Sequence, residues 1–203
     1  MNRDMISDLL ISLIAFAAVA TASPGGATTL ATASGIQFGL ARSIPLIGGI
    51  ALGLASLIGL VGGGLGSIIL SWPELQIGLR VVGSVYLLWL AWMIGRLGAP
   101  SLKAGSVASP LSFFKGALLL WLNPKGWTMA IAAASAYAGL TDSPLHLALL
   151  LGVIFGLAGI LSLTLWCMGG QWLSRVLKTE RQWRIVNIAL GLLLAVSVIP
   201  MWR

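Results

Sequence analysis

The run LLISLIAFAAVATASPGGATTLATASGIQFGLA, residues 9–41, decides the fold of this chain. It carries no charge between Asp8 and Arg42, and it is longer than the roughly 20 apolar residues that one helical membrane span needs. Pro24, followed by two glycines, lies about midway in it. Because proline removes a backbone donor and clashes with the preceding turn, a helix kinks or breaks there. The run therefore predicts a membrane helix that is broken near mid-depth.

The rest of the chain has the same apolar character. Of its 203 residues, 58% are hydrophobic and 8% are charged, and the mean hydropathy is +1.00. Since a soluble domain carries roughly a quarter charged residues, we expect an all-α integral membrane protein with a single transmembrane domain over 1–203. The net charge of +7 comes from short loops between apolar runs, which indicates orientation signals and anionic lipid rather than nucleic acid.

Charges, prolines and glycines divide the chain into six predicted transmembrane helices. These cover residues 5–30, 44–71, 75–94, 113–138, 145–171 and 185–201. Residues 9–22 also resemble the apolar segment of a signal peptide, with a small-x-small cleavage site at its end. Asp4 and Asp8 cancel the positive charge that such a signal carries, so we expect the segment to stay as a helix; the sequence leaves cleavage open.

The basic residues orient the predicted helices. With the N-terminus outside, the cytoplasmic side, mainly loops 96–112 and 172–184, holds Arg42, Arg96, Lys103, Lys115, Arg175, Lys178, Arg181 and Arg184. The outer side then holds Arg3, Arg80 and Arg203. Because cytoplasmic loops of membrane proteins are enriched in Lys and Arg, both termini are predicted to lie outside.

The two halves of the chain resemble each other at an offset of 100 residues. Identical pairs are Pro24/Pro124, Gly26/Gly126, Thr28/Thr128, Ala33/Ala133, Gly39/Gly139, Leu40/Leu140 and Ser43/Ser143. Each unit, about 5–95 and about 113–201, holds three predicted spans, and an odd number of spans forces the two units into opposite orientations. Inverted repeats of this kind, with matching broken helices near the bilayer midplane, occur in many secondary transporters.

Lys125, beside the second proline, is the only basic residue placed well inside the bilayer. Its Cα lies roughly 13 to 15 Å along the helix from Lys115, farther than a lysine stem of about 6 Å can reach. A cation at this depth is costly and is usually functional. The alternative is a structural lysine that caps carbonyl groups of the broken first span, and the sequence leaves both open.

The two proline elements form the candidate substrate site. Half-helix ends there would offer N–H donors and a positive dipole to a carboxylate. The candidate substrate-binding residues are Ser23, Pro24, Gly25, Gly26, Thr28, Asn123, Pro124, Lys125 and Gly126.

Other classes of site find little support in the sequence. Cys167 is the only cysteine and His146 the only histidine, which predicts no metal site, no disulfide and no catalytic residues. The absence of a phosphate-binding G-x-x-x-x-G-K-[S/T] element argues against ATP use and against a nucleotide cofactor. We therefore expect a protein that is not an enzyme.

Two small-residue motifs, Gly49-x-x-x-Gly53 and Gly152-x-x-x-Gly156, allow close helix packing. Such faces suit packing inside one bundle, and they also suit a homodimer interface. The sequence leaves both open.

Three motifs together resemble the lysine exporter and homoserine/threonine resistance (LysE/RhtB) family. They are S-P-G at Ser23, G-x-x-Y-L-x-x-L from Gly83 to Leu90, and N-P-K at Asn123. The resemblance covers most of the chain in length, number of spans and order of motifs. It implies an exporter of the bacterial inner membrane for amino acids or related small metabolites, with protons as the coupling ion.

The chain departs from the family pattern at two positions. Gly26 replaces the second proline of the common S/T-P-G-P element, and Leu54 follows Gly53 where the family often has an acidic residue. An interior without a carboxylate puts proton coupling through such a group in doubt, and Lys125 would repel a cationic substrate. We therefore expect a neutral or carboxylate-bearing substrate; the alternative function is a non-transporting membrane scaffold or assembly subunit.

The predicted topology is testable by chemical labelling. In a Cys167→Ser background, a cysteine at position 106 (Ser106→Cys) lies in the predicted cytoplasmic loop 96–112, so an impermeant thiol reagent added to intact cells should leave it unmodified. Labelling of that cysteine in intact cells would overturn the orientation.

Overall fold

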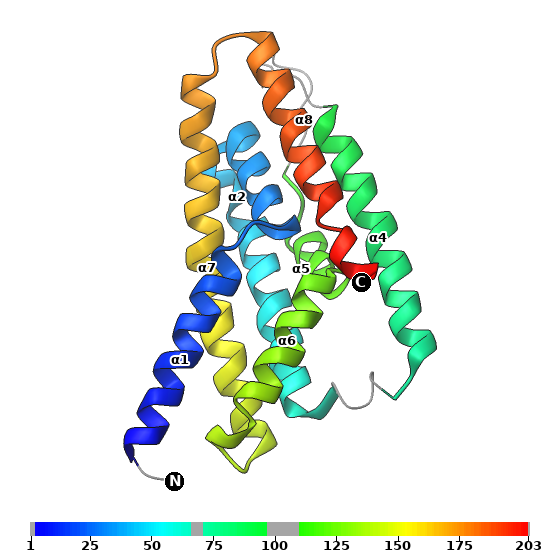
Figure 1. Cartoon of the computed structure of the whole chain (residues 1–203). Helices are drawn as coiled ribbons and strands as arrows, with labels where there is room; N and C mark the ends of the chain where they lie inside the picture. The colour runs from blue at the N-terminus through cyan, green and yellow to red at the C-terminus, as the bar shows by residue number, and fades with distance from the viewer. Residues whose placement is uncertain (1–2, 66–70, 97–109, 203) are drawn as a thin grey trace.

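A computed structural model describes residues 3–65, 71–96 and 110–202, and the described part contains helices and no strand. The elements are α1 (Arg3–Ala22), α2 (Gly26–Leu60), η1 (Val61–Leu65), α4 (Pro73–Gly95), α5 (Phe113–Trp121), α6 (Pro124–Ala136), η2 (Ala138–Leu140), α7 (Pro144–Val176), α8 (Glu180–Val196) and η3 (Ile199–Trp202). Figure 1 shows them as one elongated bundle. The expectation of an all-α chain is confirmed.

Three described helical segments are long and apolar enough to cross a membrane: Met5–Ala22, Gly26–Leu65 and Pro144–Val176. The outward face of α7 is apolar along its length, with more than half of the side-chain surface exposed at Leu149, Val153, Leu157, Leu161 and Leu165. A soluble monomer rarely exposes so continuous an apolar face. Lipid is the solvent that suits it.

Helix α2 doubles back at Gly39, whose φ of 75° lies in the left-handed region that glycine tolerates. Ser34 and Ser43 are joined by a hydrogen bond of 2.7 Å between their hydroxyls, although nine residues of straight helix would separate them by about 13 Å. Figure 1 accordingly shows α2 rising and then descending. We call residues 26–38 its first arm and residues 40–60 its second arm.

The helix ends differ from the predicted spans in physically simple ways. The predicted span 5–30 ends as α1 at Ala22, and the predicted span 113–138 divides into α5 and α6, because each contains a proline break. Much of the predicted loop 172–184 is helical: α7 continues to Val176, and Thr179 caps the start of α8 by accepting a hydrogen bond from the Gln182 amide. Loop residues 97–109, with Lys103 and the proposed label at 106, lie outside the described residues, as do 66–70.

Both glycine motifs pack against helices of the same chain. A Cβ on Gly53 would come within 2.7 Å of the Ala117 carbonyl oxygen in α5, and one on Gly152 within 3.0 Å of the Ala55 carbonyl oxygen in the second arm of α2. Glycine therefore brings α5 and α7 into backbone contact with this arm. These faces are filled within the bundle.

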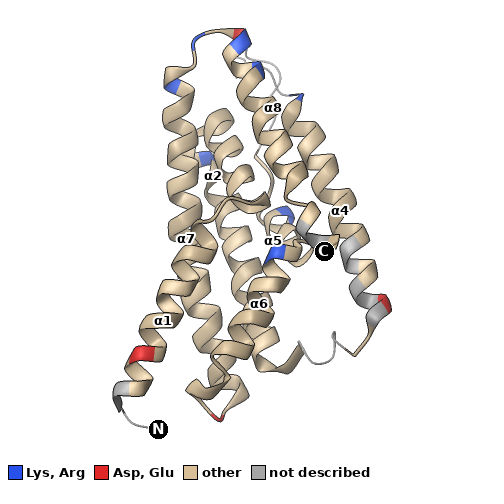
Figure 2. Ribbon diagram, viewed as in Figure 1, with Lys and Arg blue, Asp and Glu red and all other residues tan. Residues whose placement is uncertain are grey.

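The acidic residues lie at the ends of the bundle, whereas Figure 2 shows basic residues at one end and also between the ends, near α2 and α5. The end where α7 passes into α8 carries Arg175, Lys178, Arg181 and Arg184, with Glu180 among them. The opposite end holds acidic residues at Asp8 in α1, Glu74 in α4 and Asp142 before α7, all exposed.

Adjacent glycines in α7 provide a matched test of this packing. A Cβ on Gly170 would overlap the carbonyl oxygen of Thr32, whereas one on Gly169 meets nothing within 4 Å. We expect Gly170→Ala to lower the free energy of unfolding by about 1–3 kcal/mol, because the backbones must separate. Gly169→Ala should leave it unchanged or raise it by up to about 1 kcal/mol, since alanine favours a helix. Reversible unfolding in mixed micelles measures both; equal effects would contradict the close α2–α7 contact.

Candidate functional site

The first helix break leaves carbonyl groups of α1 without their usual helical donors, and side chains replace those donors. Pro24 has no N–H to give to the Ala20 carbonyl, and the Ser23 hydroxyl donates to that oxygen at 2.9 Å instead. From α7, the Ser162 hydroxyl donates to the Thr21 carbonyl at 2.8 Å, and the Trp166 indole N–H donates to the Ala22 carbonyl at 3.1 Å. The end of α1 is thus fixed to α7.

Lys125 supplies the next donors. Its Nζ donates to the Ser23 carbonyl oxygen and to the Ser23 hydroxyl, both at 2.7 Å, and lies 3.4 Å from the Pro24 carbonyl oxygen. A lysine ammonium has three donors, so two are firmly used and the third has only a long contact. The structure therefore shows Lys125 capping carbonyl groups at the end of α1, which is one of the two roles that the sequence left open. The third donor of its ammonium group is only weakly engaged.

The second break is closed by its own residues. Asn123 caps α6, with its Oδ1 accepting from the Lys125 amide at 3.0 Å, and Pro124 occupies the first helical position, where a missing N–H costs nothing. The Trp127 indole N–H donates to the Trp121 carbonyl oxygen at 2.7 Å and so bridges from α6 back to the end of α5. The Trp121 indole N–H also donates to the Ser56 hydroxyl at 3.2 Å, which fixes the end of α5 to α2.

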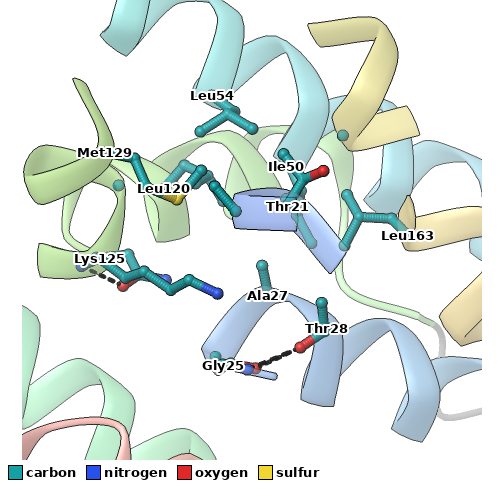
Figure 3. A pocket seen from close by; sticks show the side chains of 15 residues that line it. Thr21, Gly25, Ala27, Thr28, Ile50, Leu54, Leu120, Lys125, Met129 and Leu163 are labelled. Carbon is teal, nitrogen blue, oxygen red and sulfur yellow. Dashed lines mark hydrogen bonds between the residues drawn. The ribbon is translucent and has the colours of Figure 1, made fainter. Parts of the chain in front are cut away.

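A cavity of about 40 Å³ lies between the two breaks, with room for a few water molecules. Its lining residues come from α1, both arms of α2, α5, α6 and α7, and include Asn123 in the connection before α6 (Figure 3). They are Ala20, Thr21, Gly25, Gly26, Ala27, Thr28, Ile50, Leu54, Leu120, Asn123, Lys125, Gly126, Met129, Gly159 and Leu163. Lys125 is the one charged residue in this described lining.

The structure brings most of the sequence-predicted site residues to this cavity. Six of them line it: Gly25, Gly26, Thr28, Asn123, Lys125 and Gly126. Ser23 does not line the cavity but holds the Lys125 head, while Pro24 and Pro124 shape the breaks without lining it. The Thr28 hydroxyl accepts from the Gly25 amide at 2.8 Å and donates to the Gly25 carbonyl at 2.9 Å, which closes the turn into α2.

Sequence reasoning missed the apolar wall of the cavity and the donors on α7. The wall residues are Ile50, Leu54, Leu120, Met129 and Leu163, and the donors are Ser162 and Trp166. The sequence drew attention to Leu54 only because the family often has an acidic residue at that position, and the structure places Leu54 in this wall. The others carry no local signal, because leucine, isoleucine and methionine occur throughout such a chain.

The cavity has one polar side and little negative charge near it. The Asn123 side chain is 5% exposed, and its Oδ1 accepts from the Lys125 amide in the cap of α6. The first turn of α2, whose amides have no partner within the helix, borders the same space. The acidic residues whose burial is described, Asp8, Glu74, Asp142 and Glu180, are all exposed at the ends of the bundle. The arrangement is suited to an anionic group.

Curated relatives of this chain are efflux proteins. It is 26% identical over 190 residues to the cysteine/O-acetylserine efflux protein of Escherichia coli O139:H28 (strain E24377A / ETEC), covering 94% of this chain and 95% of the relative. The proteins of that name from Escherichia coli strain K12 and Shigella sonnei strain Ss046 are 25% identical, with the same coverage. No solved structure matches the chain.

The match to a family model is nearly complete. The model described as LysE type translocator matches residues 18–198, which include both helix breaks, the cavity and every candidate site residue. The family resemblance drawn from the three sequence motifs is thereby confirmed. This chain belongs to the LysE type translocator family of membrane proteins.

Proposed function

We propose that this protein exports amino acids or related small metabolites across the bacterial inner membrane as a secondary-active transporter working by alternating access. The observation that carries the proposal is the cavity between two helix breaks, with Lys125 at its edge, in a LysE type translocator. Broken helices that meet near the bilayer midplane are how many secondary transporters build their substrate sites.

The helix pairing supports an inverted repeat of three plus three spans. The second arm of α2 packs against α7, and α4 packs against α8, so corresponding elements of the two halves pair with each other. α1 contacts α7 just as α5 contacts the second arm of α2. The cavity is lined by both members of three offset-100 pairs, Gly25/Lys125, Gly26/Gly126 and Ala20/Leu120. A site on a pseudo-two-fold axis has this pattern.

The charge distribution supports the predicted orientation. The strongly basic end of the bundle, at the α7–α8 connection, is the cytoplasmic one by the positive-inside rule. The start of α1 lies at the opposite end (Figure 1), which supports an N-terminus on the outside. The C-terminus lies about halfway along the bundle in the same view, and its outside location rests on the predicted topology.

At the proposed site the substrate is held by its carboxylate. Lys125, Asn123 and the first turn of α2 line the cavity, and the third Lys125 donor makes only a long contact, of 3.4 Å, with the Pro24 carbonyl oxygen. A carboxylate placed there accepts charge-assisted hydrogen bonds and lies at the positive end of the α2 dipole. A cationic side chain would meet Lys125 without a carboxylate to pair with, so neutral amino acids, including cysteine, are the proposed substrates.

An aromatic cluster closes the cavity toward the N-terminal end. The Phe16 ring lies 5.9 Å from the Phe155 ring and 6.2 Å from the Tyr137 ring, and the Tyr137 hydroxyl hydrogen-bonds the Ser12 hydroxyl at 3.1 Å. Phe16 and Phe155 lie one helical turn outward from the cavity residues Ala20 and Gly159. Opening toward the outside then requires these rings to separate, as alternating access demands.

Protons are proposed as the coupling ion. No carboxylate lines the cavity among the described residues, which leaves Lys125 as the ionisable group at the site.

Because α5 and α7 fill the glycine faces, any homodimer must use another surface.

The substrate proposal is tested by counterflow in proteoliposomes. Vesicles loaded with unlabelled cysteine should accumulate labelled cysteine, whereas vesicles loaded with lysine should not accumulate labelled lysine, because Lys125 repels a second cation. Counterflow of lysine alone would overturn the substrate class, and no counterflow of any amino acid would favour the scaffold alternative.

The role of Lys125 is separated from helix capping by a matched pair of variants. We expect Lys125→Ala to abolish counterflow, because both the carboxylate partner and a cap of α1 are lost. Ser162→Ala removes a cap of the same helix end, at a cost of roughly 1 kcal/mol in stability, but leaves the charge in place and should retain counterflow. Wild-type counterflow by folded Lys125→Ala, or equal loss in both variants, would contradict the assignment.

A further inference from the structure

The cavity has two unlike sides, as Figure 3 shows. Lys125, Gly25 and Thr28 lie on one side, whereas the Thr21 side chain lies beside Ile50. Leu54, Leu120 and Met129 lie across from the first three residues, with Ile50 and Leu163 completing an apolar wall. A solute that fits both sides has a carboxylate at one end and a short uncharged group at the other.

Met129 holds a special place in the apolar wall. It follows Lys125 by four residues on α6, so the two side chains lie on the same face of that helix, about 6 Å apart along its axis. The other wall residues belong to α2, α5 and α7. A substrate whose carboxylate contacts Lys125 therefore extends along α6 toward Met129.

The opposite side of the cavity is made of the smallest residues. Gly25, Gly26 and Ala27 border it from the turn into α2, and Figure 3 shows the Ala27 methyl group directed into the space. A Cβ on Gly25 would come within 3.2 Å of the Lys125 side chain, so the missing side chain there gives the lysine stem its path. The residues on the Met129 side are therefore the ones large enough to limit the length of a substrate side chain.

We propose that Met129 limits the length of the transported side chain, so that this protein exports amino acids with short, uncharged side chains and rejects long or aromatic ones. The inference rests on the proposed function and deepens it. The side chains of the apolar wall set how far a substrate held at Lys125 can extend across the cavity. Met129 is the wall residue on the same helix as Lys125, one turn further along, so its truncation opens space in the direction in which a substrate held at Lys125 extends.

The test compares counterflow of labelled alanine, cysteine, methionine and leucine by wild-type protein and Met129→Ala. We expect the wild type to favour alanine and cysteine, and Met129→Ala to raise the leucine-to-cysteine ratio roughly tenfold, since one or two methylene groups in an apolar pocket discriminate by that order. Met129→Leu, which conserves volume, should keep the wild-type ratio.

Met93→Ala is the matched control. Met93 in α4 also packs against the buried core but does not line the cavity, so its truncation should leave the substrate ratio unchanged. A leucine gain in Met93→Ala as large as that in Met129→Ala would assign the effect to loosened packing and overturn the inference.

Ala27→Val tests the same space from its other side and does not depend on the folding of Met129→Ala. Two added methyl groups in the cavity should abolish counterflow of methionine while that of alanine persists. Unchanged substrate ratios in both Met129→Ala and Ala27→Val, in protein that still transports cysteine, would overturn the inference and leave the proposed function standing. Wild-type protein that transports no amino acid would instead overturn the proposed function itself.

Discussion

The structure depends on how backbone groups are satisfied where a membrane helix breaks. In hydrocarbon no water is available to hydrogen-bond a freed carbonyl, so each one needs a protein donor. At the end of α1, five consecutive carbonyls from Ala20 to Pro24 have partners from Ser23, Ser162, Trp166 and Lys125. This requirement brings α7 and α6 to the first break and thereby places the two breaks beside one cavity.

The sequence predicted these breaks well because their cause is local. Proline fixes its own φ and lacks a donor whatever surrounds it, so α1 and α5 end next to Pro24 and Pro124 as expected. Lys125 was identifiable because a charge far from any polar boundary is rare in an apolar helix. Its partner Ser23 could not be identified from the sequence, because the two residues are 102 positions apart and meet only when the two halves of the chain pack together.

Features that arise from packing were the ones the sequence could not supply. Nothing in the local pattern distinguishes Ser162 or Trp166 from other small polar or aromatic residues of α7, although both cap α1. The close α2–α5 and α2–α7 contacts were suggested by glycine spacing, but whether they join helices of one chain or of two depended on the fold. The reversal of α2 at Gly39 was likewise expected only as a connection between two apolar runs.

The two proposed repeats contribute unequally to the cavity, and this asymmetry gives the site its chemistry. At the paired positions the second half supplies Lys125 and Leu120 where the first half has Gly25 and Ala20. Two identical units would place like groups about the axis, either two cations that repel or two voids that bind nothing. Because at these paired positions the first half provides space and the second provides the charge and part of the apolar wall, a small amphipathic solute meets unlike groups on its two sides. An inverted repeat can then keep the symmetry that alternating access needs while its binding site remains directional.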